Sequence, residues 1–150
     1  MPEKTPVEIA DVYSRKRPVI FGVATVLFLV IQIVTRPFFT VGPETAQYLT
    51  RQVMWSVNVI FLLLCLATGG GILSRRDIRA LVNDEVSRSN YRTSAIAGFW
   101  VAMVTALGVF FLPVAESFTA RQVVYVIVTS STSIALLAFS YLELRAHRDE

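Results

Sequence analysis

Five consecutive hydroxyl side chains, Thr129 to Ser133, form the most concentrated polar chemistry in this chain. Neutral hydroxyl groups can line a narrow pore, or they can hydrogen-bond one membrane helix to another. Because successive residues of an α-helix are rotated by about 100°, five in a row point to all sides of the helix. Ser and Thr can also return hydrogen bonds to the preceding turn of their own helix. We therefore favour interhelical hydrogen bonding, with a small channel lined by this run as the alternative.

Two amide side chains, Gln32 and Asn58, also lie within long apolar stretches. An amide that faces lipid leaves its hydrogen bonds unmade, so we expect both side chains to face protein. The residues that we consider as pore-lining or interhelical polar groups are therefore Gln32, Asn58, Thr129, Ser130 and Thr132.

Residues that commonly carry catalysis or bind metals are scarce. His147 is the only histidine and Cys65 the only cysteine. Haem held by two histidines, a zinc or di-metal centre and a redox cysteine pair therefore lack ligands. A serine nucleophile would need a base, and the long apolar stretches contain none. Asp77, Asp84 and Glu85 alternate with arginines, which is typical of a solvated helix. We expect no enzyme activity, no cofactor and no metal.

Four apolar segments must position these groups, and they cover about residues 19–35, 53–73, 95–115 and 122–142. None contains Asp, Glu, Lys, Arg or His. Each is long enough to cross a hydrocarbon core about 30 Å thick. The 54% hydrophobic and 17% charged fractions also differ from those of an average soluble protein. The sequence therefore predicts one all-α transmembrane domain over residues 1–150, rather than a soluble protein with a buried helical core.

Basic residues are distributed unevenly among the connections. All but three of the 14 Lys and Arg residues lie before the first segment, between the second and third, or after the fourth; the exceptions are Arg36, Arg51 and Arg121. The positive-inside rule then predicts a bacterial inner-membrane protein with both termini and the central connection in the cytoplasm. Basic residues beside spans contact anionic lipid, so the net charge of +3 does not indicate nucleic-acid binding.

The central connection predicts an amphipathic cytoplasmic helix over about residues 75–93. Apolar residues recur on one face at steps of three and four, and Asp84 and Glu85 precede Arg88 in the favourable acid-then-base order. Nothing from Ser87 to Ala97 breaks a helix, so continuity with the third span is favoured over a helix lying on the membrane. The arginines predicted to contact lipid or a partner are Arg75, Arg76, Arg79, Arg88 and Arg92.

Short connections and small residues indicate how the spans pack. Few residues separate Glu116 from Arg121, so the third and fourth spans are expected to form a tight hairpin. The predicted architecture is two antiparallel hairpins joined by the cytoplasmic helix. Small residues that permit close helix approach are Gly98, Ala102 and Ala106 on the third span and Ser131, Ala135 and Ala138 on the fourth. These two spans are expected to pack together, and a second copy or a larger membrane complex is the alternative.

The N-terminal residues 1–17 are polar and contain Pro2 and Pro6. We expect them to form a frayed tail rather than a short amphipathic turn. Pro18 is expected in the first turn of the first span, where a missing backbone N–H is tolerated.

The segment Leu81-Val82-Asn83-Asp84-Glu85-Val86-Ser87-Arg88, which leads into Ala95-Ile96-Ala97-Gly98-Phe99-Trp100, resembles the central part of small uncharacterised bacterial membrane proteins. Those proteins carry an Asp-Glu-x-x-Arg segment before the third of four spans. The resemblance implies the same four-span topology and assigns no activity. From the residues we expect a non-catalytic accessory or scaffold subunit that interacts through helix packing and a basic cytoplasmic helix.

Overall fold

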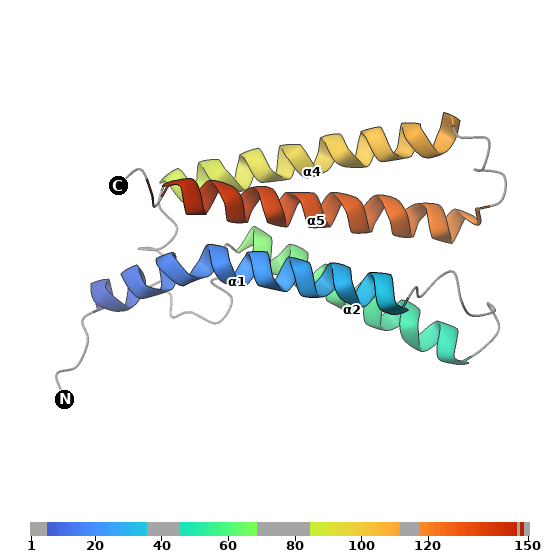
Figure 1. Ribbon diagram of the computed structural model, residues 1–150, viewed down its shortest axis with the longest axis horizontal. Helices are drawn as coiled ribbons and strands as arrows, with labels where there is room; N and C mark the ends of the chain where they lie inside the picture. The colour runs from blue at the N-terminus through green and yellow to red at the C-terminus, as the bar shows by residue number, and fades with distance from the viewer. Residues whose placement is uncertain (1–5, 36–45, 69–84, 112–117, 147, 149–150) are drawn as a thin grey trace.

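The computed structural model describes residues 6–35, 46–68, 85–111, 118–146 and 148, and these form four helices (Figure 1). The helices are α1 (Pro6–Thr35), α2 (Ala46–Ala67), α4 (Glu85–Phe111) and α5 (Ala120–Ala146). Each contains a stretch that is long and apolar enough to cross a membrane. The prediction of an all-helical chain with four candidate membrane spans is therefore confirmed.

The first helix begins earlier than predicted. α1 starts at Pro6 and continues through Pro18, so the expectation of a frayed tail is wrong for residues 6–17. Pro18 lies inside the helix and not in its first turn, and its side chain is buried. The Ser140 hydroxyl of α5 donates a hydrogen bond of 2.6 Å to the Pro18 carbonyl oxygen. This bond ties α5 to the backbone of α1 at the proline, whose missing N–H leaves the carbonyl of residue 14, one turn earlier, without its helical donor.

The other helices also extend beyond the apolar segments. α2 begins at Ala46, before the predicted residue 53, and residues 69–73 of that segment lie outside the described part of the chain. α4 runs without a break from Glu85 to Phe111, through the region in which the sequence predicts no helix breaker. Residues 75–84 of the expected cytoplasmic helix and residues 112–115 of the third segment are outside the described residues. α5 extends the fourth segment to 120–146.

α5 lies at the centre of the helix packing. α4 runs along one side of it, and α1 and α2 lie on the other side (Figure 1). Buried positions on α5 recur at steps of four and three, from Tyr125 through Leu136 to Glu143. This spacing keeps one long face of the helix against its neighbours.

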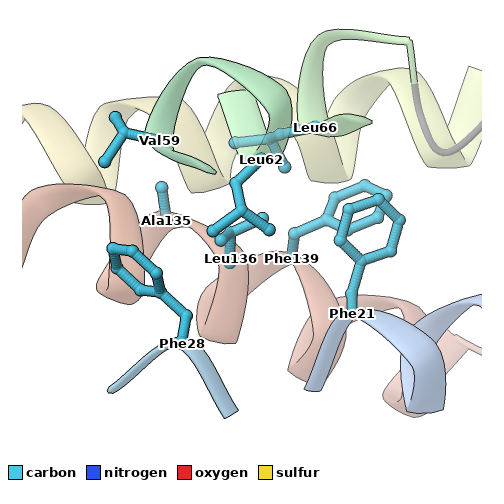
Figure 2. Packing of buried hydrophobic residues seen from close by; sticks show 8 residues of the cluster. All are labelled: Phe21, Phe28, Val59, Leu62, Leu66, Ala135, Leu136 and Phe139. Atoms are coloured by element: carbon cyan, nitrogen blue, oxygen red, sulfur yellow. The ribbon is translucent and has the colours of Figure 1, made fainter. Parts of the chain in front are cut away.

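A cluster of aromatic and aliphatic side chains joins α1, α2 and α5 (Figure 2). The rings of Phe21 and Phe139 meet edge to face, with centroids 5.2 Å apart and planes at 74°. Aromatic pairs favour this geometry because the positive edge of one ring meets the negative face of the other. The cluster consists of Phe21, Phe28, Val59, Leu62, Leu66, Ala135, Leu136 and Phe139.

The contact between α4 and α5 depends on small residues instead. A Cβ atom built on Gly98 would lie 2.9 Å from the Ala135 Cβ and 3.0 Å from the Ser131 carbonyl oxygen. Gly98 is buried, whereas Ala102 and Ala106 are half-buried. A ridge of residues spaced by four rotates gradually around the helix, because a turn contains 3.6 residues. The ridge therefore meets α5 most closely at Gly98.

Large apolar side chains cover the outer faces of the bundle. Val34 is 76% exposed on α1, Met54 is 67% exposed on α2, and Phe110 is 77% exposed on α4. A soluble protein rarely exposes contiguous apolar surface on this scale. The surface fits a lipid environment, in agreement with a multi-pass membrane protein.

Candidate functional site

A buried polar cluster joins three helices at one end of the bundle. Arg17 of α1 donates a hydrogen bond of 3.2 Å from Nη1 to the Ser87 hydroxyl of α4. Ser87 in turn donates to Oε1 of Glu143 on α5 at 2.9 Å, and the Asn90 amide donates to the same oxygen at 3.3 Å. Arg17, Ser87 and Glu143 are each at most 6% exposed. We call these four residues the basic-end cluster.

Packing holds the Arg17 side chain in this cluster. The guanidinium carbon lies 4.8 Å from the centroid of the Phe139 ring, which is a cation–π contact. Pro18 is the next residue, and its carbonyl oxygen accepts the hydrogen bond from Ser140. A Cβ on Gly22, one turn further on, would lie 3.1 Å from the Ser140 hydroxyl oxygen. α1 and α5 thus approach closely beside the cluster.

Glu143 directly follows the fourth apolar segment, which ends at residue 142, and the sequence predicts no partner for it. The structure gives it partners on α4 that lie more than fifty residues away in sequence. One signal was available: Ser87, Asn90 and Ser94 recur at steps of three and four and so share one helix face. That pattern identifies a polar face on α4, but it does not identify the carboxylate that the face meets.

Exposed basic residues surround the cluster. Since Arg17, Ser87 and Glu143 are in one hydrogen-bonded group, the residues beside them belong to the same end of the bundle. Those exposed residues are Arg15, Lys16, Arg88, Arg92, Arg145 and Arg148. Arg51 lies toward the other end, where its Nη1 donates to the Thr35 carbonyl oxygen at 3.4 Å. Arg75, Arg76 and Arg79 of the predicted arginine cluster lie outside the described residues.

The hydroxyl run on α5 contacts two different helices. Thr129 accepts a hydrogen bond of 3.2 Å from the Trp55 indole of α2. Ser130 lies 3.4 Å from the Thr105 hydroxyl of α4. Ser130, Ser131 and Ser133 also donate to carbonyl oxygens of the preceding turn. Thr132 is buried. The run is therefore distributed around α5 and is not a single polar stripe.

The two amides are placed differently. Gln32 is buried, and its Oε1 accepts a hydrogen bond of 3.2 Å from the Tyr125 hydroxyl. Asn58 is half-buried on α2, and no side chain or backbone group of the described residues hydrogen-bonds to its amide. Beside this hydrogen bond an open groove of about 570 Å³ lies between α1 and α5. It is lined by Leu29, Gln32, Ile33, Tyr125, Val126, Thr129 and Ser130.

Replacement of Trp55 by phenylalanine tests the interhelical use of the hydroxyl run. The variant keeps an aromatic ring beside Tyr125, whose centroid is 5.5 Å away, but loses the donor to Thr129. We expect a loss of about 0.6–1.5 kcal/mol in the free energy of unfolding, measured in mixed micelles. Trp100 is 62% exposed on α4, so Trp100→Phe is the matched control and should change stability little. Equal effects of the two substitutions would contradict a structural role for the Thr129 hydroxyl.

The described residues define an all-helical protein with four candidate membrane spans, three of which, α1, α4 and α5, are joined at one end by a buried polar cluster. The chain has no significant match to a protein-family model, to a curated protein or to a solved structure. Within the described helices, no three His, Cys, Asp or Glu side chains come together as metal ligands could.

Proposed function

We propose that this chain is a non-catalytic inner-membrane protein that acts as a small scaffold or accessory subunit. The observation that carries the proposal is the use of its interior polar groups. Trp55 and Thr129, Tyr125 and Gln32, and Ser140 and the Pro18 carbonyl join different helices. Hydrogen bonds between helices stabilise a bundle, and they leave those groups unavailable to a permeating ion.

The proposed topology is two antiparallel hairpins, α1 with α2 and α4 with α5, with both termini in the cytoplasm. The exposed basic residues around the basic-end cluster support this orientation, because positively charged residues are retained on the cytoplasmic side. The segment before α4 completes the proposed cytoplasmic surface. The Asp-Glu-x-x-Arg motif, Asp84 to Arg88, runs into the start of α4 and accords with the four-span proteins that the sequence resembles.

The proposed contact surface is the exposed face at the start of α4. Arg88 and Arg92 are four residues apart and exposed, while Ser87, Asn90 and Ser94 of the same turns are buried or half-buried. The helix is therefore tied to α5 by one face and presents two arginines on the other. Such a surface attracts anionic lipid of the inner leaflet or an acidic region of a cytoplasmic partner.

The double substitution Arg88→Gln/Arg92→Gln tests this surface. It leaves Arg75, Arg76 and Arg79 in place, so the membrane orientation should be retained, which reporter fusions would check. We expect at least a tenfold loss of whatever co-purifies with the full chain in mild detergent, since each arginine near an anionic surface contributes about 1 kcal/mol. Mass spectrometry of both lipid and protein identifies the contact.

The matched control is Arg121→Gln, because Arg121 is exposed at the start of α5, at the end of the bundle opposite Glu143. It should retain the co-purifying lipid and protein. If the double variant retains the same lipid and protein as the parent chain, the α4 surface has no role in partner binding.

The alternative function is a small channel or facilitator lined by Thr129, Ser130 and Thr132. Ser130 and Thr129 line part of the groove between α1 and α5, which is the observation in its favour. Both hydroxyls also take part in contacts with other helices, so we favour the scaffold.

A further inference from the structure

Asn58 is half-buried on α2, at the middle of the candidate span Leu49–Ala67. The amide has no hydrogen-bond partner among the described residues. At the middle of a bilayer no water is present to hydrogen-bond to an amide. An amide without a protein partner there therefore costs free energy. By contrast, the Gln32 amide, near the C-terminal end of α1, is buried and accepts a hydrogen bond from Tyr125.

Asn58 belongs to a regular line of residues along α2. Met54, Asn58, Phe61 and Cys65 are separated by four, three and four residues, and we call them the α2 seam. Met54 and Phe61 are 67% and 56% exposed, and Asn58 and Cys65 are half-buried. The seam borders the face formed by Val59, Leu62 and Leu66, which packs toward α5, and the half-buried Cys65 also touches that cluster. Steps of four and three keep residues on one side of a helix, where a second helix can pack along its length.

We propose that the α2 seam pairs with the same seam of a second copy of this chain, and that the two Asn58 amides hydrogen-bond to each other. The occupant is a second copy because an amide carries both a donor and an acceptor and is complementary to itself. A single asparagine at such a position specifies the register and the oligomeric state of paired helices. This proposal rests on the single membrane orientation proposed above, which puts both Asn58 residues at the same depth.

The small residues of α4 do not offer a comparable surface to a second copy. Gly98 lies against Ala135 and Ser131 within one chain, so that part of α4 is already covered. The dimer axis is therefore placed at α2, along the membrane normal. Identical residues meet across such an axis.

Cys65 makes the proposal directly testable. It lies seven residues from Asn58 on the same line, about 10 Å along the helix, and it is the only cysteine of the chain. In a parallel pair the two Cys65 thiols lie close to each other. Mild oxidation with copper phenanthroline of membranes that contain the full chain should therefore give a disulfide-linked dimer on non-reducing gels.

Cysteines at different positions on α2 distinguish a specific dimer from random collision of two chains, because only cysteines on the seam should cross-link in a specific dimer. With Cys65→Ser as background, Phe61→Cys on the seam should also cross-link. Leu64→Cys in the same background should not, because Leu64 is 52% exposed and lies on the opposite side of α2 from the α5-facing residues. Cross-linking at Leu64 as efficient as at Cys65 would show that the dimer is not built on the seam.

The Asn58→Leu substitution tests the amide. We expect the dimer to dissociate at about a tenfold higher protein-to-lipid ratio than the parent chain, because two interhelical hydrogen bonds are lost. The matched control is Ser56→Ala, since the Ser56 hydroxyl donates to the Gln52 carbonyl of its own helix. It should dimerise like the parent.

Three outcomes would contradict self-pairing: no cross-linked dimer, a dimer that is insensitive to Asn58→Leu, or linkage of Cys65 to a different protein. The test is independent of partner capture. A chain that dimerises but co-purifies with nothing would refute only the scaffold role. A chain that captures a partner but does not cross-link would refute only the dimer.

Discussion

Replacement of Gly98 by leucine is expected to destabilise the bundle by about 1–3 kcal/mol, which is typical of overpacking in a close contact. The nearest groups are the Ala135 Cβ and the Ser131 carbonyl oxygen, and both would lie within 3.0 Å of a new Cβ. A backbone oxygen cannot rotate away as a flexible side chain can. α4 must therefore move away from α5, and the contact between these two helices is lost along part of its length.

Gly108 provides the matched control for this substitution. It lies on the same helix, and a Cβ added there would meet nothing within 4 Å. Gly108→Leu should be neutral or slightly stabilising, because leucine favours the helix over glycine by up to about 1 kcal/mol. Unfolding in mixed micelles, followed by circular dichroism, measures both variants. Equal stability of the two would mean that α4 and α5 do not pack through Gly98.

Replacement of Glu143 by leucine is expected to have the largest effect, a loss of about 3 kcal/mol or more in the free energy of unfolding. It removes the Glu143 carboxylate from a buried cluster that also contains the Arg17 guanidinium. Ser87 and Asn90 lose the oxygen to which they donate, and Arg17 keeps its charge beside the Phe139 ring. Glu143→Gln keeps a carbonyl acceptor and should fall between the parent and Glu143→Leu. The free energy of unfolding is the measurement.

Substitution of two serines of α4, one inside the basic-end cluster and one outside it, tests whether the cluster stabilises the bundle. Ser87→Ala removes the hydroxyl that joins Arg17 to Glu143 and should lose about 1–3 kcal/mol of stability. Ser89 is two residues away and exposed, so Ser89→Ala should change stability by no more than about 0.5 kcal/mol. The basic-end cluster would have no stabilising role if both Ser87→Ala and Glu143→Leu behaved like Ser89→Ala.

The helices could be predicted from the sequence because charge-free apolar length is a strong local signal. Their ends were less predictable. The N-terminal part of α1 carries apolar residues for only one short amphipathic turn, and Pro18 resembles a helix start although it lies inside the helix. The continuity of α4 through Ser87 could be foreseen, because it needs only the absence of a breaker.

Polar contacts within one helix could be predicted from the sequence, whereas those between helices could not. The return of the Ser131 and Ser133 hydroxyls to the preceding turn follows from the helix alone. The pairing of Glu143 with Ser87 depends on which helices become neighbours, and charge and spacing within one segment do not contain that information. The same holds for Asn58: that no described residue hydrogen-bonds to its amide can be known only once the neighbours of α2 are known.

Flux through proteoliposomes most directly tests the proposal that this protein is a scaffold and not a channel. Purified full-length chain in vesicles should carry no ion or small solute faster than protein-free vesicles, because Thr129 and Ser130 hydrogen-bond within the bundle. The variant with Thr129, Ser130 and Thr132 all changed to valine or alanine should behave identically. Flux through the parent chain that falls in this variant would contradict the scaffold and establish the channel.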